Sequence, residues 1–397
     1  MKLAIIIPGF QADERDWCIP AFTNLAQELA KSVELHVFAL RYPHSRRSYR
    51  IGPVRVHAFG GSAISGRRVP GVGVLKLWRD ALAAIEREHK RGKFSAIIGV
   101  WATESGWLAT RAARRLGVPS LVHLAGGELV NLPDIKYGNQ APGLSRLLVS
   151  RTLRRADALT VPSAPQEQAL RARRDVDGSK IRRWSLGVDT QMFAPDTQLE
   201  TRTEASPFTF ITVGSLIPVK GHEWLVRGAA ALRETAPDVP FRLQIVGTGP
   251  LLPHLQAQAR QLDLADYVNF LGDVRHEALP AVLRQADCFL LGSYHEAQCM
   301  AALEAMACGL PWIAPPVGAL VDCARIEPGE TPSGILLRDR SVQALADVMY
   351  TIMLASLDER RAMGDAARRR VERDYFLQTQ TARLLDLVAK VDTLPLG

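Results

Sequence analysis

The amino-acid sequence predicts an α/β protein built from two facing, doubly wound, Rossmann-like domains. The first observation is length, because 397 residues suit two domains of about 150 to 200 residues each. The second is the alternation of short apolar runs with amphipathic stretches along the chain, which is typical of β-α-β units. The third is that these runs are apolar almost throughout, which indicates parallel strands covered by helices on both faces.

In the first half the apolar runs predict six strands, with helical patterns between several of them. The expected strands are 2–8, 33–40, 54–59, 94–100, 119–125 and 157–163, and the expected helices are 17–32, 73–91 and 104–117. Residues 194–207 combine two prolines with polar residues and no clear pattern, so they are the best linker candidate.

After the linker the alternation restarts and predicts a second sheet. The expected strands are 208–215, 241–249, 268–272, 287–293, 311–317 and 334–337, and the expected helices are 221–236, 251–262, 276–286, 296–308 and two more beginning near 341 and 358. We therefore place the first domain at 1–195 and the second at 196–375, and we expect a last helix, about 376–397, to pack back on the first domain. Ligands of such sheets bind beyond the carboxyl ends of the strands, in a cleft between the two domains.

Composition favours a soluble, cytoplasmic protein. The chain is 47% hydrophobic and 23% charged, as in ordinary globular proteins. The apolar start is interrupted by Pro8 and followed by an acidic stretch, which indicates a buried strand and not a signal peptide. No window approaches the roughly 18 apolar residues of a membrane span. The five cysteines form no CxxC pair and are expected to be reduced core residues.

The net charge of +8 is unevenly distributed. Residues 1–200 hold 30 Lys+Arg and 18 Asp+Glu, and residues 201–397 hold 19 and 23, so the halves carry +12 and −4. The excess lies mainly in clusters at 46–50, 150–157 and 169–183. These are either solvated helix faces or a surface that attracts anionic lipid headgroups at the inner face of the membrane, or an anionic substrate. Nucleic acid is not expected, because the clusters lack interleaved aromatic residues.

Two carboxylates stand eight positions apart in an otherwise small and apolar run, at Glu296 and Glu304. In one helix this spacing gives a rise of about 12 Å and a rotation of about 80°, too far apart to share a proton. Glu304 has apolar helical neighbours, so it needs a partner such as a backbone amide or an arginine. Glu296 lies at or before the helix start, where free amides can bind an anion.

The spacing suggests one elongated ligand with an anionic middle and hydroxyl-rich ends, which is the layout of a nucleoside diphosphate sugar. Lys220 lies directly before Gly221 at an expected helix start, where a cation opposes the helix dipole unless an anion binds there. The alternative is a solvated loop lysine. Gly247 and Gly249 permit close backbone approach after a strand, but the GxGxxG spacing is not met.

Several motifs taken together resemble a known enzyme family. "HEAQCMAALEAMACGLPWIAPPVGA" resembles the E-x7-E segment of the retaining glycosyltransferases of group 1, also called family 4, whose fold is called GT-B. "VGSLIPVKGHEWLVRGAAAL", "LQIVGTGPLLPHL" and "ADCFLLGSYHE" extend the resemblance. It covers most of the chain, strongly from about 156 to 375 and weakly before 118.

The resemblance implies roles for individual residues. Glu296 would contact donor-sugar hydroxyls, Glu304 the ribose, and Lys220 the diphosphate. His123 would touch the transferred sugar, although it can also be a packed residue at a strand end. The remaining expected donor contacts are backbone groups and one loop side chain, at Gly9, Ser215, Gly249, Cys299, Met300 and Ala301.

The chain departs from the family pattern at three places. Ser215 stands where an arginine is common, so the second cation on the diphosphate is missing or comes from elsewhere. "AQC" at 297–299 replaces the usual residues after Glu296, which bears on the hexose contacts. Trp312 replaces a common valine, and its indole N–H needs an acceptor.

The resemblance implies transfer of a hexosyl group from a nucleoside diphosphate sugar to an acceptor hydroxyl, lipid-linked, polysaccharide or small-molecule, with retention of anomeric configuration. Neither a metal nor a cofactor is expected, because Lys220 and the helix amides meet the diphosphate charge. Asp175 and Asp177 form a DxD pattern, which we interpret as a solvated turn. The alternatives are a sugar-nucleotide epimerase of related architecture and a non-catalytic sugar-binding protein.

Overall fold

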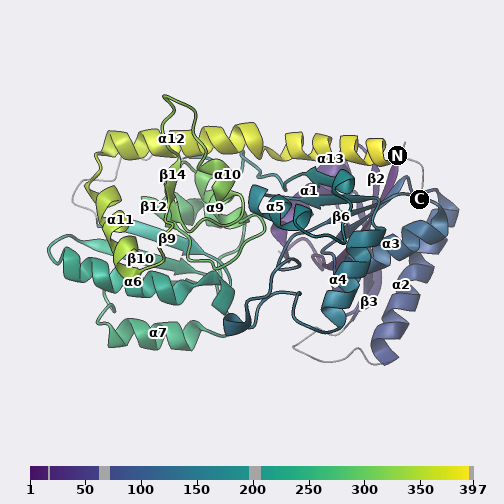
Figure 1. Ribbon diagram of the computed structural model, residues 1–397, viewed down its shortest axis with the longest axis horizontal. Coiled ribbons are helices and arrows are strands. Elements are labelled where there is room, and N and C mark those ends of the chain that lie inside the picture. The colour runs from purple at the N-terminus through teal and green to yellow at the C-terminus, as the bar shows by residue number, and fades with distance from the viewer. Residues whose placement is uncertain (17, 62–71, 196–206, 393–397) are drawn as a thin grey trace. The chain divides into compact units, whose positions relative to one another are not determined.

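The computed structural model describes residues 1–16, 18–61, 72–195 and 207–392, and it divides the chain into two compact α/β units. The first comprises Met1–Gly187 with Leu377–Gly397, and the second comprises Val188–Phe376. Each unit has its own sheet with helices around it (Figure 1). The predicted fold class is confirmed.

The two units divide at residue 187, eight residues before the domain boundary expected from sequence. Val188 begins the second unit because its N–H donates to the Tyr375 carbonyl at 2.7 Å, and Phe193 is buried in that unit's core. Most of the predicted linker, 196–206, lies outside the described residues. The last helix, α13 (Leu377–Asp392), belongs to the first unit and contacts α1 (Pro20–Leu29).

The first unit contains an eight-stranded sheet in the order β3-β4-β2-β1-β5-β6-β7-β8. All neighbouring strands are parallel except β3 and β4. The strands are β1 (Lys2–Gly9), β2 (Glu34–Tyr42), β3 (Arg46–Ile51), β4 (Val54–Phe59), β5 (Ala96–Val100), β6 (Ser120–His123), β7 (Ala158–Val161) and β8 (Ile181–Arg183). The remaining helices are α2 (Val72–Arg91), α3 (Glu104–Leu116), α4 (Leu144–Arg155) and α5 (Ala164–Arg171).

The basic cluster at 46–50 is not on a helix, which corrects one interpretation made from the sequence. It forms the edge strand β3, which pairs antiparallel with β4 through a tight turn at Gly52, whose φ is 51°. Arginines on an edge strand discourage pairing with another sheet. The cluster at 150–157 ends α4, and the cluster at 169–183 runs from α5 to β8.

The second unit contains a six-stranded, fully parallel sheet in the order β11-β10-β9-β12-β13-β14. The strands are β9 (Phe208–Val213), β10 (Phe241–Val246), β11 (Val268–Gly272), β12 (Cys288–Leu290), β13 (Trp312–Ala314) and β14 (Gly334–Leu336). The helices are α6 (His222–Thr235), α7 (Leu252–Gln261), α8 (Leu279–Leu283), α9 (Met300–Ala307), α10 (Leu320–Cys323), α11 (Val342–Leu354) and α12 (Leu357–Asp374).

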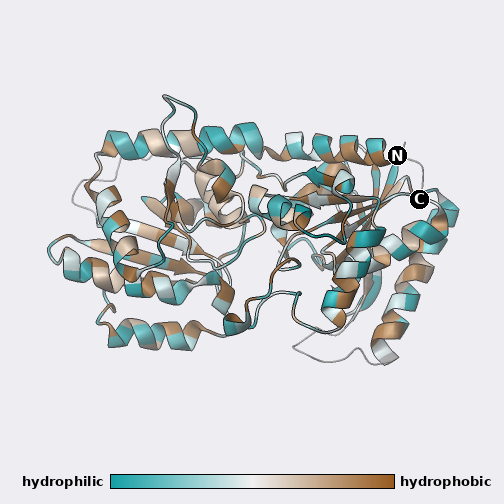
Figure 2. Cartoon of the chain, in the orientation of Figure 1, coloured by the Kyte–Doolittle hydropathy of each residue, from teal (hydrophilic) through white to brown (hydrophobic). Residues whose placement is uncertain are grey.

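The core of the second unit lies on both faces of its sheet, because successive strand residues point to opposite sides. Phe289 packs with residues of α9 and α12, whereas its neighbour Leu290 packs with residues of α6 and α11. Figure 2 shows the strands largely in hydrophobic colours and the helices with both colours. Trp312 is fully buried, and its indole N–H donates to Ser333 Oγ at 3.3 Å, which satisfies the group as the sequence required.

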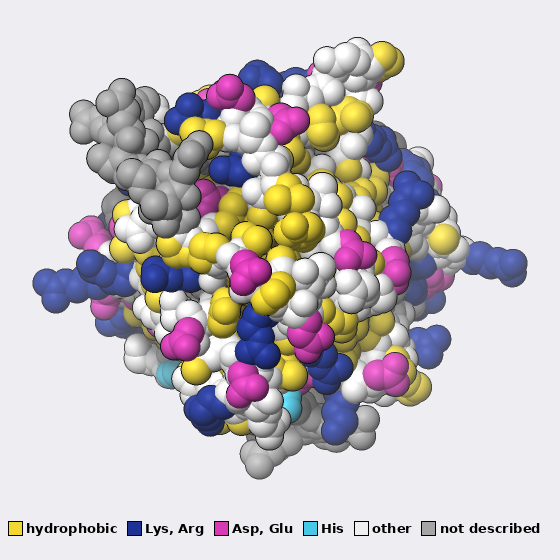
Figure 3. Space-filling model, turned by 90° about the vertical axis from the view of Figure 1, so that its left-hand side faces the viewer, with side chains coloured by type: hydrophobic (Ala, Val, Ile, Leu, Met, Phe, Trp, Pro, Cys, Tyr) yellow, Lys and Arg dark blue, Asp and Glu magenta, His cyan; other side chains and the backbone are white. Residues whose placement is uncertain are grey.

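All five cysteines are free, and four of them are buried, as expected for reduced core residues. Of the helices that the structure describes, none combines the length and the apolar character needed to cross a lipid bilayer. Figure 3 shows the side of the molecule where α6 and α11 lie, and there acidic and basic side chains are interspersed.

Candidate functional site

The candidate site of the second unit lies at the carboxyl edge of its sheet. Strands β9 and β12 are adjacent and parallel, so the loops that follow them meet at the same edge. The Tyr294 N–H donates to the Val219 carbonyl at 2.8 Å. Gly221 and Gly292 are in such close contact that a Cβ on Gly221 would lie 2.0 Å from the Gly292 oxygen. The two loops are therefore held together by backbone contacts.

Lys220 and Glu296 form an ion pair between these two loops. The Lys220 Nζ to Glu296 Oε1 distance is 2.7 Å, and the side chains are 28% and 11% exposed. Ser293 Oγ also donates to Glu296 Oε1 at 2.7 Å. The other carboxylate oxygen, Oε2, accepts no hydrogen bond from the described residues. Two of the residues predicted from sequence are thus brought together, and one face of the Glu296 carboxylate stays available to a ligand.

Helix α9 begins at Met300, so Glu296 precedes it by four residues. The expectation of one helix over 296–308 is wrong at its start. Cys299 adopts φ 80° and ψ 69°, a left-handed conformation that is rare for residues other than glycine. The helix therefore cannot extend through Cys299 to Glu296. The first amides of α9, at Met300 and Ala301, have no preceding helical carbonyl to bind, so they can bind an anion.

Glu304 lies in the middle of α9, and its partner is a histidine. The Glu304 Oε1 to His276 Nε2 distance is 2.9 Å, and both side chains are about nine-tenths buried. A partner was required by burial, although an amide or an arginine was expected. His276 comes from the loop between β11 and α8 and packs against Phe193. Glu304 Oε2 accepts no hydrogen bond from the described residues.

Two other predicted positions lie on loops at the same edge. Ser215 is exposed in the loop after β9. A Cβ on Gly249 would lie 2.6 Å from the Leu216 oxygen, and Leu216 N–H donates to the Thr248 carbonyl at 2.8 Å. A glycine at 249 is therefore needed for contact between the loops after β9 and β10, whatever the ligand.

Arg340 is a cation at this edge that no sequence motif indicated. Its guanidinium donates to the carbonyls of Gly292 at 2.8 Å and Ser293 at 3.0 Å. It also lies over the rings of Trp224 and Tyr294, at 4.6 and 4.3 Å from their centroids. Its role in the described structure is to hold the loop after β12 in place.

In the first unit His123 ends β6 and is 1% exposed. Its Nδ1 lies 3.0 Å from Thr160 Oγ1, and its ring packs edge-on against Trp184. Burial lowers the pKa of His123 to about 3, so the imidazole is neutral at pH 7. Nε2 is buried and has no hydrogen-bond partner among the described residues. This orphaned atom is a group that a ligand hydroxyl can satisfy.

Gly9 ends β1, and a Cβ there would approach the Tyr42 Cβ to 3.2 Å and the Cys18 Sγ to 3.4 Å. The local packing thus favours a glycine at this position.

The loop after His123 is organised around a buried carboxylate. Glu128 is 0% exposed and accepts the N–H groups of Ala102 at 3.3 Å, Ala125 at 3.2 Å and Gly126 at 2.7 Å. Burial raises the pKa of Glu128 despite these hydrogen bonds. No role for Glu128 was predicted from the sequence.

The DxD pattern is part of a local turn, as interpreted from sequence. Asp175 accepts hydrogen bonds from Arg173 at 2.9 and 3.0 Å and from Ser150 at 2.8 Å. Asp177 accepts the Ser179 N–H at 2.9 Å and caps a short 3-10 helix.

Comparison with known proteins identifies the family. Residues 19–187 match the family described as glycosyl transferase 4-like domain, and residues 207–354 match glycosyl transferases group 1. The GDP-mannose-dependent alpha-(1-6)-phosphatidylinositol monomannoside mannosyltransferase of Mycolicibacterium smegmatis is 30% identical over 316 residues, which cover 75% of this chain and 79% of the relative. The chain belongs to the group 1 glycosyltransferases.

Two further proteins are similar to this group 1 glycosyltransferase. The D-inositol 3-phosphate glycosyltransferase of Salinispora arenicola is 29% identical over 309 residues, covering 68% of this chain and 67% of the relative. The structure of sucrose-phosphate synthase from Thermosynechococcus elongatus superposes with a TM-score of 0.78 at 22% identity, covering 98% of each chain. The shared fold is GT-B, as the resemblance implied.

Proposed function

We propose that this group 1 glycosyltransferase moves a hexosyl group from a nucleoside diphosphate sugar to an acceptor hydroxyl, with retention of anomeric configuration. The observation that carries the proposal is the clustering of Lys220, Glu296 and the first amides of α9 at one sheet edge. Glu304, whose partner is His276, follows one helical turn further along α9. This arrangement matches a ligand with an anionic middle between two hydroxyl-bearing groups.

The cationic end of this site would stabilise the leaving diphosphate. Lys220 has three donor positions, so it can keep its bond to Glu296 and still donate to a phosphate oxygen. The amides of Met300 and Ala301 would add two more donors. Because negative charge grows on the leaving group as the sugar bond breaks, donors fixed in advance lower the barrier.

The two carboxylates would bind hydroxyl groups. Glu296 Oε2 would accept from the hexose and Glu304 Oε2 from the ribose, since the other oxygen of each is already bonded. His123 Nε2 in the first unit would hydrogen-bond a hydroxyl of the transferred sugar. In the second unit Ser215 and the backbone at Gly249 and Cys299 would line the donor. The reaction would need neither a metal nor a cofactor.

A thermal-shift experiment tests the donor assignment. GDP-mannose, UDP-glucose and ADP-glucose are added in turn, and one of them should raise the melting temperature, since a ligand at 100 times its Kd stabilises the native state by about 2.7 kcal/mol. Glu304→Ala should abolish this shift. Glu277, the exposed residue next to His276, supplies a matched control. Glu277→Ala removes the same charge and should still show the thermal shift. An equal shift in all three proteins would refute the role of Glu304.

Retention and group transfer are tested with the donor so identified. The nucleoside diphosphate should be released only when an acceptor is present, and NMR of the product should show the anomeric configuration of the donor. Release without any glycoside product would favour the epimerase alternative, and an inverted product would exclude retention.

Helix α4 supports an anionic, lipid-linked acceptor. Leu144 and Leu147 are 41% and 44% exposed, and four exposed arginines accompany them on the same helix, at 146, 151, 154 and 155. Exposed leucines beside arginines are typical of surfaces that bind anionic membranes. The names of the two relatives, which mention D-inositol 3-phosphate and phosphatidylinositol monomannoside, agree with an acceptor that carries phosphate.

Sedimentation with vesicles tests this contact. The wild-type protein should bind phosphatidylserine-containing vesicles at low salt and should not bind phosphatidylcholine vesicles. Arg151→Glu with Arg154→Glu should weaken binding at least about thirtyfold, since each basic residue contributes about 1 kcal/mol at an anionic surface. The control is a second double variant with the same change in charge, Arg361→Glu with Arg369→Glu, at two exposed positions on α12. Equal sedimentation with both vesicle types would contradict the contact.

A further inference from the structure

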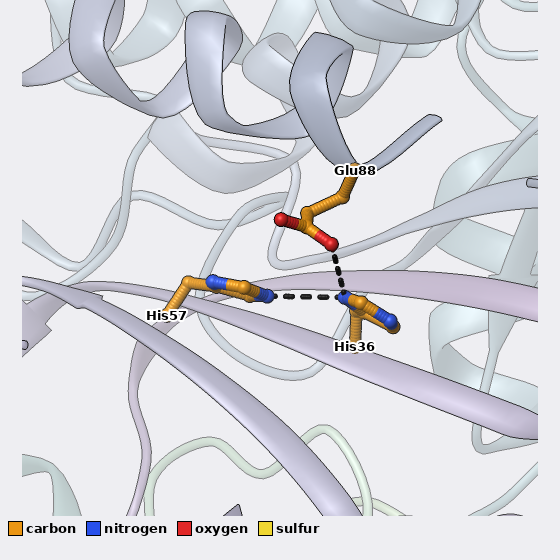
Figure 4. A group of neighbouring side chains, drawn as sticks. All are labelled: His36, His57 and Glu88. Atoms are coloured by element: carbon orange, nitrogen blue, oxygen red, sulfur yellow. Dashed lines mark hydrogen bonds and ion pairs between the residues drawn. The ribbon is translucent and has the colours of Figure 1, made fainter. Parts of the chain in front are cut away.

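Three potential metal ligands converge in the first unit, far along the sequence from one another. His36 lies on β2, His57 on the neighbouring strand β4, and Glu88 near the end of α2. Figure 4 shows the two imidazole rings and the carboxylate pointing toward one another beneath the helix. One ligand atom of each lies within 4.8 Å of the other two.

We propose that His36 Nδ1, His57 Nε2 and a Glu88 carboxylate oxygen bind one divalent cation of the zinc type. Two imidazoles and a carboxylate with an open fourth position form a common donor set for zinc. This inference is independent of the glycosyltransferase reaction, because none of these residues belongs to the donor site.

The distances fit such a site with small movements. Metal–nitrogen bonds of about 2.0 to 2.1 Å in a tetrahedron place neighbouring ligand atoms about 3.3 Å apart. The His36 Nδ1 to His57 Nε2 distance is 3.0 Å, and the His36 Nδ1 to Glu88 Oε2 distance is 3.9 Å. The third pair, His57 and Glu88, lies within 4.8 Å, so a cation would require the Glu88 carboxylate to move toward the two rings.

The outer contacts orient both rings for metal binding. Glu34 Oε1 lies 3.1 Å from His36 Nε2, so a proton on Nε2 leaves the lone pair of Nδ1 directed at the cluster. Ser48 Oγ lies 3.3 Å from His57 Nδ1 and can accept a hydrogen bond from an N–H at that nitrogen, which leaves the lone pair on Nε2. A carboxylate behind a ligating histidine is a regular feature of zinc sites.

The cluster is largely buried, and basic residues lie beside its carboxylates. Burial lowers the pKa of both histidines, that of His57 to about 4, so no proton has to be displaced from them at pH 7. Arg91 binds Glu88 through Oε1 at 2.8 Å, while Lys2 donates to the Glu88 backbone carbonyl. Oε2 is the oxygen turned toward His36. Glu34 lies 3.7 Å from Arg55 and 4.0 Å from Lys2, so both carboxylates also have basic partners.

The position of the cluster indicates a structural role. His36 lies near the amino end of β2, away from the carboxyl edge where ligands of such sheets bind. A bound cation would connect two strands and a helix that are 21 and 31 residues apart along the chain. It would therefore stabilise the first unit without entering the reaction.

Metal analysis of the full-length protein tests the proposal. The protein is treated with a chelator, re-equilibrated with limiting Zn²⁺ or Co²⁺ and dialysed, and metal content, melting temperature and the visible Co²⁺ spectrum are measured. We expect one equivalent of metal, a raised melting temperature and the intense absorption of four-coordinate Co²⁺. Glu88→Gln and His57→Gln should each raise the Kd for the metal by at least about tenfold. Loss of a residue that only hydrogen-bonds a metal ligand already weakens metal binding about tenfold to a hundredfold.

Glu86→Gln is the matched control, because Glu86 lies on the same helix and pairs with Arg115 outside the cluster. It should bind metal as the wild type does. Less than one equivalent of bound metal in the wild type, or the same affinity in Glu88→Gln and Glu86→Gln, would overturn the proposal. The histidines would then serve only as a hydrogen-bonded pair between Glu34 and Ser48. Circular dichroism of the metal-free variants separates loss of ligand from loss of fold.

Discussion

Replacement of Lys220 by alanine is expected to lower kcat by about two orders of magnitude at saturating donor, within the range found when one fixed donor to a developing negative charge is removed. The fold should remain intact, because the Lys220–Glu296 pair is partly exposed and such pairs contribute at most about 1 kcal/mol. The measurement is steady-state kinetics together with a melting curve.

Two other variants make the Lys220 result specific. Lys220→Arg should restore part of the activity, because it keeps a positive charge near the diphosphate. Lys76→Ala, on an exposed position of α2, should leave kcat unchanged. A kcat for Lys220→Ala within twofold of the wild type would exclude the proposed role in leaving-group stabilisation.

Glu128→Ala is expected to have the largest effect on stability in the first unit. It would leave the buried N–H of Ala102 and the partly buried N–H groups of Ala125 and Gly126 without their acceptor. Each orphaned group costs about 1 to 3 kcal/mol, so we expect a loss of about 3 to 5 kcal/mol in the free energy of unfolding. The melting temperature of that unit should fall by roughly 10 °C.

Glu128→Gln should lose less, because its amide oxygen can still accept on one side of the cluster. Glu167→Ala, a partly exposed glutamate on α5, serves as the control. Denaturant unfolding of all three variants measures the order of their free energies of unfolding. An unchanged stability of Glu128→Ala would show that the carboxylate does not hold the loop.

Most strands could be predicted because parallel strands buried on both faces are apolar throughout. The two strands of the first unit that were missed lack this signal. β3 reads "RRSYRI" with three exposed arginines, and β8 has only three residues in a basic run. The helices α4 and α5 were not among the expected helices, although solvated helix faces were one interpretation of the basic clusters that overlap them.

The candidate site could be predicted only where its residues lie in recognisable motifs. Lys220 and Glu296 were found in this way, and the structure adds that they contact each other. His276 and Arg340 were not found, because their partners lie 28 and 47 residues away in sequence. The start of α9 was misplaced because nothing in the sequence marks Cys299 as a left-handed residue. Likewise, His36, His57 and Glu88 follow no spacing typical of metal ligands.

The contact between Gly221 and Gly292 has a consequence for how this enzyme can change its specificity. Neither position has room for a side chain, so substitutions there would separate the loops that carry Lys220 and Glu296. Variation that keeps the proposed donor site together therefore has to spare this junction, and Ser215 and the segment 297–298 are positions beside it. A library of variants at Ser215 and 297–298, with Gly221 and Gly292 unchanged, is a direct way to alter donor preference.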